Sequence, residues 1–173
     1  MFGTSLLFGG LSKPFIELSI GDFVDNSIIY YVDPLDNTRG IGLALTDAGS
    51  VRFAGTTNIN DTSNSHLEFN NNTNYLISVL GTSTSNAVGL ARAYGDGTWD
   101  LPSGYFMTSN YDLINTALVN NGGTALSTGW YWTSTFYAQY DSVRETRPRY
   151  GQSELGAVNT VNLVRPVRAV GNW

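Results

Sequence analysis

The stretch Gly129-Trp130-Tyr131-Trp132-Thr133-Ser134-Thr135 is the most informative part of this chain of 173 residues. Up to Phe136 its aromatic and β-branched residues alternate in the pattern of a half-buried β-strand. An aromatic side chain as large as that of Trp132 gains most by packing inside a core. We therefore expect a strand here with Trp132 in the protein interior.

Further strands are predicted on both sides of this one. The predicted segments are residues 15–20, 27–32, 41–45 and 50–53 before it, and residues 137–143 and 162–170 after it. Residues 33–37 (DPLDN) form a turn, because Pro34 fixes φ and the Asp and Asn side chains can bond to their own backbone. Both ends of the chain are therefore expected to be β-structure.

Helical patterns lie in the middle of the sequence. Residues 71–80 have one apolar stripe, and residues 86–94 follow Asn86, which can cap a helix. A third helix is expected to begin with Ser103 as its N-cap and to end at residues 120–123 (NNGG). Strands, then helices, then strands predict one α+β domain over residues 14–173, in which the N- and C-terminal strands pair.

The composition limits the function. Charged residues are 13% of the chain and the formal net charge is −5, with one lysine beside eight arginines. A nucleic-acid-binding protein needs clustered Lys and Arg, so that class is not expected. Without cysteine the chain has no disulfide and no thiolate chemistry. The single histidine, His66, lies in a polar stretch, and we expect it to be a solvated surface residue.

Three sets of motifs occur in a defined order. They are Ile20-Gly21-Asp22-Phe23 with residues 28–33 and 40–44, Trp99-Asp100-Leu101-Pro102-Ser103 ahead of Asp112-Leu113, and residues 129–135 with residues 164–170 at the end. Over about residues 18–171 the chain resembles the Fibrobacter-major-paralogue and collagen-like-protein C-terminal type of domain. The resemblance implies a C-type-lectin-like fold, with mixed or antiparallel twisted sheets and two or three helices. The chain departs from that pattern in having Asp112-Leu113, further from the Leu-Pro-Ser triplet, in place of Glu-Leu, and in lacking a cysteine pair.

Four residues of these motifs are expected to be structural. Trp99 and Trp132 lie inside the motifs, which favours packing over sugar stacking. Arg165 and Arg168 are three apart in a predicted strand, so we expect them on opposite faces. One of them is expected to pair with a carboxylate such as Asp100 or Asp112.

The best candidate for ligand binding is the segment of residues 137–150. Tyrosine and arginine, the types that interfaces favour, are frequent in it. The candidate residues are Tyr137, Tyr140, Asp141, Arg144, Arg147, Arg149 and Tyr150, together with Trp130. The alternative is a solvated hairpin in which the arginines pair with Asp141 and Glu145.

No motif predicts catalysis or a cofactor. The chain lacks a nucleophile–base pair, an HExxH motif, a P-loop and a GxGxxG motif, so we expect a protein that is not an enzyme. Calcium is an open alternative, because residues 33–37 could offer three oxygens, although turn chemistry explains them equally well.

Residues 1–13 are apolar and glycine-rich, without the basic region of a secretion signal or a run long enough to cross a bilayer. We expect an extended arm that docks on a partner. A polar, sparsely charged chain with neither disulfides nor an export signal is typical of a phage virion protein released by lysis.

These features predict a non-enzymatic binding module on a virion surface, in a fibre, a tail or a capsid-attached adhesin. Its expected partners are a host surface glycan or protein, other virion subunits through residues 1–13, and further copies in a homo-oligomer such as a trimer. Membrane insertion is not expected. The alternatives are a structural decoration or cement protein of the particle, and a bacterial surface adhesin.

Overall fold

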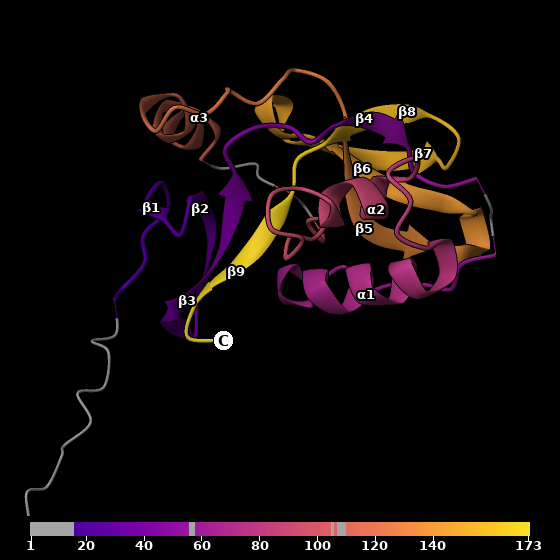
Figure 1. The fold of residues 1–173 in the computed structure, drawn as a ribbon, viewed down its shortest axis with the longest axis horizontal. Coiled ribbons are helices and arrows are strands. Elements are labelled where there is room, and N and C mark those ends of the chain that lie inside the picture. Colours follow the sequence, from indigo (N-terminus) through magenta and orange to yellow (C-terminus); the bar gives the residue numbers. More distant parts are fainter. Residues whose placement is uncertain (1–15, 56–57, 105, 107–109) are drawn as a thin grey trace, which may run out of the picture.

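The structure, a computed structural model, describes residues 16–55, 58–104, 106 and 110–173. Within these ranges the chain has an α+β fold with nine strands in two sheets and three α-helices (Figure 1). The expected α+β class is confirmed. The arm expected at residues 1–13 lies outside the described residues.

The strands form a first sheet in the order β1-β2-β3-β9 and a second sheet in the order β4-β8-β5-β6-β7. Their bounds are β1 (Phe23–Val24), β2 (Ser27–Asp33), β3 (Asp36–Ala44), β4 (Gly49–Arg52), β5 (Tyr131–Tyr137), β6 (Ser142–Arg147), β7 (Gln152–Ala157), β8 (Val161–Val164) and β9 (Val167–Gly171). The pairing of β5 with β8 is parallel and the other pairings are antiparallel. β9 pairs with β3, so the C-terminal strand joins the N-terminal sheet, but it does not pair with the N-terminal strand β1, which lies at the other edge of that sheet.

Three α-helices and three single-turn 3-10 helices connect these strands. They are α1 (Phe69–Leu80), α2 (Ala87–Arg92), α3 (Tyr111–Asn120), η1 (His66–Glu68), η2 (Ala138–Tyr140) and η3 (Pro148–Tyr150). α1 and α2 pack against the second sheet, and α3 lies beside the first (Figure 1). Asn86 caps α2 as expected, since its side-chain oxygen accepts a hydrogen bond of 2.7 Å from the backbone N–H of Gly89.

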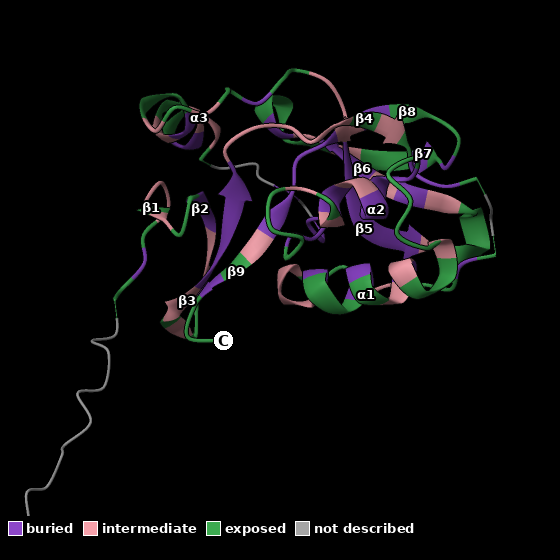
Figure 2. Cartoon of the chain, in the orientation of Figure 1, coloured by how far each residue is buried: buried purple, intermediate pink, exposed green. Residues whose placement is uncertain are grey.

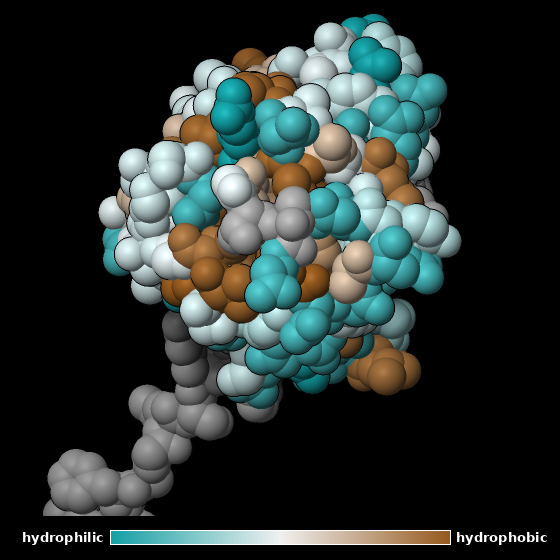
Figure 3. All heavy atoms as spheres, turned by 90° about the vertical axis from the view of Figure 1, so that its right-hand side faces the viewer, coloured by the Kyte–Doolittle hydropathy of each residue, from teal (hydrophilic) through white to brown (hydrophobic). Residues whose placement is uncertain are grey.

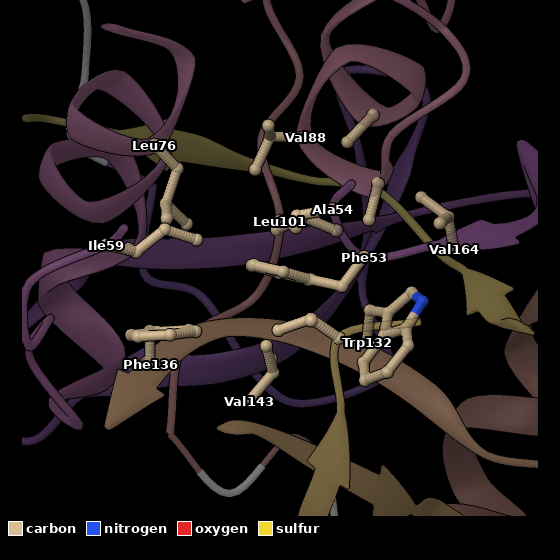
Figure 4. Close-up of a cluster of buried hydrophobic side chains, with 13 residues drawn as sticks. Phe53, Ala54, Ile59, Leu76, Val88, Leu101, Trp132, Phe136, Val143 and Val164 are labelled. Atoms are coloured by element: carbon tan, nitrogen blue, oxygen red, sulfur yellow. The ribbon is translucent and has the colours of Figure 1, made fainter. Parts of the chain in front are cut away.

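β5 contributes side chains to two separate hydrophobic clusters, because consecutive side chains of a strand point to opposite faces. Trp132 is fully buried among residues of α1, α2 and the second sheet, including Phe53 (Figure 4), and its Nε1–H donates to the carbonyl of Val51 at 2.8 Å. Tyr131 is fully buried in the other cluster, where its ring meets Phe106 edge-on. Both faces of this strand are therefore enclosed, and β5 is coloured as buried over nearly its whole length in Figure 2.

Buried hydrogen bonds join β5 to the Leu-Pro-Ser motif. The backbone N–H of Ser134 donates to the carbonyl of Pro102 at 2.7 Å, and the Asn72 amide of α1 donates to Ser103 Oγ at 3.0 Å. The Ser103 hydroxyl is thus used inside the protein and does not cap a helix. The predicted start of the third helix was wrong, because α3 begins only at Tyr111.

Three predicted strands were also wrong. The segment predicted as a strand at residues 137–143 contains the end of β5, the 3-10 helix η2 and the start of β6. Residues 16–20 form no strand, and Leu18 is attached by a backbone hydrogen bond of 2.8 Å to the carbonyl of Asn37. The strand predicted at residues 162–170 is two strands of different sheets, β8 and β9. Pro166 lies between them and has no N–H with which to continue a ladder.

Arg165 occupies the point where the chain passes from the second sheet to the first. Its side chain is fully buried, and Nε donates to the Asp47 carboxylate at 2.6 Å. Nη1 donates to the carbonyls of Ala44 and Leu45 at 3.0 and 2.9 Å, and Nη2 donates to the carbonyl of Thr124 at 3.2 Å. One guanidinium therefore satisfies three backbone carbonyls and a carboxylate around this crossing.

The partners predicted for the two arginines were wrong. Asp100 pairs with Arg92 of α2, and Asp112 is an exposed residue in the first turn of α3. Arg168 lies 3.8 Å from Asp96 and stacks over the ring of Trp99, with Cζ 5.0 Å from its centroid. Because β8 ends at Val164 and β9 begins at Val167, Arg165 lies in no strand, and the expectation of opposite faces on one strand does not apply to Arg165 and Arg168.

Replacing Arg165 with lysine will destabilise the domain by about 3–5 kcal/mol, because one ammonium cannot reach all four acceptors, which include the buried carbonyl of Ala44 and the carboxylate of Asp47. The check is chemical denaturation at neutral pH. Arg168→Lys is the matched control and will change the free energy of unfolding by less than about 1 kcal/mol, since its ion pair is partly exposed. Equal effects of the two variants would contradict this role of Arg165.

Candidate functional site

The segment predicted to bind ligand, residues 137–150, is not one loop. It contains the end of β5, the turn with η2, all of β6, and the turn with η3. Successive turns of an antiparallel meander lie at opposite ends of the sheet, and the six residues of β6 separate them by about 20 Å. The prediction of a single binding surface was therefore wrong, and the candidate residues form two groups.

The first group surrounds Arg144, near the β5–β6 turn. Arg144 Nη2 donates to the hydroxyl of Tyr137 at 2.7 Å, and Nη1 donates to Ser153 Oγ at 2.9 Å. Tyr140 is 60% exposed, and Asp141 ends η2 with a φ of 48°. Figure 3 views this end of the molecule, where hydrophilic surface surrounds a patch of apolar residues. Arg144 is thus engaged within the sheet, and Tyr140 is the exposed aromatic of the group.

The second group is a stack of Trp130, Arg147 and Tyr150, which we call the arginine–aromatic stack. The guanidinium carbon of Arg147 lies 5.2 Å from the centroid of the Trp130 ring and 5.1 Å from that of Tyr150. Its Nε–H donates to the carbonyl of Thr128 at 3.2 Å, which fixes its orientation. Tyr150 is 54% exposed, and Arg149 lies 5.9 Å from its ring. Cation–π contacts therefore hold this partly exposed group of side chains in place.

Glu145 does not face solvent beside an arginine. It is buried on β6, accepts a hydrogen bond from the Asn162 amide, and lies opposite Glu154 in the β6–β7 register. Burial, and then the charge of Glu154, raise the pKa of the Glu145 carboxyl. This carboxylate is a buried structural group, contrary to the solvated hairpin considered as the alternative.

A pocket that sequence reasoning did not predict lies beside the first turn of α1 and the C-terminal residues. It has a volume of about 510 Å³ and is lined by residues from four separate segments, including Asn70, Thr98, Arg168 and Trp173. Burial raises the pKa of Asp100 at its base, against the opposing effects of Asn70 and Arg92. The available signal in the sequence was a fourth tryptophan, Trp173, outside the structural motifs.

His66 differs from the expected solvated histidine. Its ring stacks on Tyr31 with centroids 4.8 Å apart and meets Tyr30 edge-on at 6.4 Å. Nδ1 is buried without a hydrogen-bond partner among the described residues. Burial lowers the pKa of the imidazole below its ordinary value. The charge of a protonated His66 would therefore be poorly solvated in the folded protein.

The turn considered for calcium is explained by its own hydrogen bonds. Asp33 Oδ1 accepts from the backbone N–H of Leu35 at 2.9 Å, and Asp36 Oδ1 accepts from both the N–H and the hydroxyl of Thr38. In the described ranges, no three or more His, Cys, Asp or Glu residues gather in a way that could hold a metal ion. None of the helices found there is long and apolar enough to span a membrane.

Comparison with known proteins adds no functional assignment. No family model matches the chain, and no curated protein matches it.

Protonation of His66 will occur at a lower pH than that of an exposed histidine, whose pKa is about 6.5. Because the folded-state pKa is lowered, the domain loses stability as the pH falls through the ordinary histidine value. An NMR titration can follow the imidazole signals of this single histidine. His66→Phe will remove this part of the acid sensitivity, and a titration midpoint at or above about 6.5 would contradict the burial.

Glu145→Gln will raise the midpoint of thermal unfolding at pH 7 by about 3 °C. The raised pKa means that the charged form of Glu145 opposes folding, so this penalty is present at neutral pH and disappears as acid protonates the carboxyl. Glutamine keeps an acceptor for Asn162 and gives Glu154 a donor. Scanning calorimetry at pH 7 and at about pH 4 checks this, since the advantage must shrink in acid. A lower midpoint at pH 7 would show that the charge stabilises the fold.

Proposed function

We propose that the chain is a non-enzymatic, C-type-lectin-like binding module displayed on a phage virion, where it recognises a host surface glycan or protein. The observation that supports this proposal best is the arginine–aromatic stack. Trp, Arg and Tyr are the types most enriched among residues that dominate binding energy. Since the rings and the guanidinium hold one another in place, little side-chain entropy is lost when a partner docks on them.

The scarcity of charge in the chain, where charged residues are 13%, fits such a role. The guanidiniums of Arg147 and Arg149 both lie over the ring of Tyr150. A polar surface of low charge density limits non-specific attraction to nucleic acids. This arrangement supports recognition by shape and stacking.

A second candidate function, structural decoration of the particle, has its own support. Apolar side chains are exposed on the first sheet and on α3, with Phe23 49%, Leu35 94% and Leu113 51% exposed. Leu113 lies against Gly21, next to β1, so part of this surface is continuous. Exposed apolar side chains can mark a subunit contact when they gather into a patch. In this reading the copies form a homo-oligomer or bind other virion subunits.

Substituting Tyr150 with alanine will weaken binding of the labelled full chain to host cells or to a glycan array by at least about tenfold. Tyr140→Ala is the matched control, because Tyr140 is equally exposed at the opposite end of β6. Its binding must equal that of the unchanged chain. Binding that survives in the Tyr150 variant, or binding to assembled particles alone, would refute recognition by the stack, and the latter result would support the decoration role.

A further inference from the structure

The pocket beside Trp173 has a polar wall and an aromatic wall. Asn70 and Asn71 of the first turn of α1, with Thr98, form the polar wall, while Phe69 and Trp173 form the aromatic one. Its volume of about 510 Å³ lies within the range of small-molecule sites. Convergent hydrogen-bonding groups opposite an aromatic surface suit a ligand that has both hydroxyl groups and an apolar face.

The indole of Trp173 is fixed although it is near the end of the chain. Its Nε1–H donates to the carbonyls of Gly40 and Val170, both at 3.0 Å, and its ring meets Phe69 edge-on at 6.0 Å. The guanidinium carbon of Arg39 lies 4.5 Å from the ring centroid. The residue is nevertheless 46% exposed. A ring that is already ordered and still exposed can stack on a ligand at a low entropic cost.

The polar wall is ordered by hydrogen bonds below its surface. Asp100, which is 2% exposed, accepts from the Asn70 amide at 2.9 Å and binds Arg92 on its other side. The Asn71 amide donates to Glu68 at 2.7 Å. A side-chain amide has two donor hydrogens and an acceptor oxygen, so both asparagines retain hydrogen-bonding capacity. These contacts fix the asparagines in orientations from which they can bind hydroxyl groups.

The two charged residues that line the pocket, Asp100 and Arg168, each have a partner of opposite charge. The carboxylate of Asp100 is paired with Arg92, and the guanidinium of Arg168 lies 3.8 Å from Asp96 and over the ring of Trp99. A phosphate would approach the buried carboxylate of Asp100, and an amine would approach Arg168. Both charged ligands are therefore disfavoured, which leaves a neutral one.

We infer that this pocket binds a neutral pyranose, with the apolar face of the sugar on Trp173 and its hydroxyl groups on Asn70, Asn71 and Thr98. The pocket is separate from the arginine–aromatic stack in the fold, so it is a second recognition site beyond the proposed one. A sugar residue at the end of a larger glycan would fit it as well as a free one, provided that the rest of the glycan extends to solvent.

The test is an NMR titration of the ¹⁵N-labelled full chain with neutral methyl pyranosides of glucose, galactose, mannose and N-acetylglucosamine. The four tryptophans give four indole N–H signals, and Trp173→Phe assigns the relevant one. At least one pyranoside is expected to shift the Trp173 signal saturably, with a dissociation constant on the order of 1 mM. No shift with any pyranoside up to about 50 mM would overturn the inference, as would a shift confined to the signal of Trp130.

Variants then locate the site through saturation-transfer NMR of the sugar. Trp173→Ala and Asn71→Ala will each weaken binding by at least about tenfold, while the remaining indole signals report that the fold is intact. Tyr150→Ala is the matched control and must bind the pyranoside normally. Because that same variant is expected to lose cell binding, failure of the pocket and failure of the proposed function give different results. Unchanged binding by Trp173→Ala would overturn the inference.

Discussion

The structure depends on the hydrogen bonds of one buried side chain, Arg165. At the crossing between β8 and β9 the chain leaves one sheet for the other, and the guanidinium bonds there to the buried carbonyl of Ala44 and to the part-buried carbonyls of Leu45 and Thr124. Leaving a buried carbonyl unpaired costs about 1–3 kcal/mol. A planar guanidinium with five donors can bond to these carbonyls and to Asp47 at once, which the compact ammonium of a lysine cannot do.

The crossing between β8 and β9 also determines where both candidate sites lie. After Pro166, β9 runs beside β3 and brings Arg168 and Trp173 to the first turn of α1, where the pocket forms. Before it, β8 pairs with β5, whose start positions Trp130 for its contact with Arg147. The two candidate sites thus lie on segments before and after this connection, and they share no residue.

Much of the fold was predictable because periodicity and turn chemistry are local properties. The burial of Trp132, the cap at Asn86 and the turn after Asp33 follow from residue types at fixed spacings. The start of α3 was missed because Ser103 can cap a helix in isolation, but here its hydroxyl is used in a buried network with Asn72.

The candidate sites were harder to predict, since they depend on pairings distant in sequence. The prediction of a single surface at residues 137–150 was wrong, because the six-residue strand β6 lies in the middle of this segment and separates its two ends. The strand order, and not any local pattern, determines that Arg165 pairs with Asp47 and not with Asp100. It also determines that Trp173 and Asn70 line the same pocket. Such contacts become visible only when the topology is known.

The most direct measurement is native-state hydrogen exchange of the full chain, comparing the amide of Leu43 in the first sheet with that of Leu163 in the second. If Arg165 joins the sheets into one cooperative unit, both amides will exchange only through global unfolding, with the same free energy of opening. Exchange of one sheet at a distinctly lower free energy, while the other stays protected, would show that the sheets unfold separately and would contradict the account.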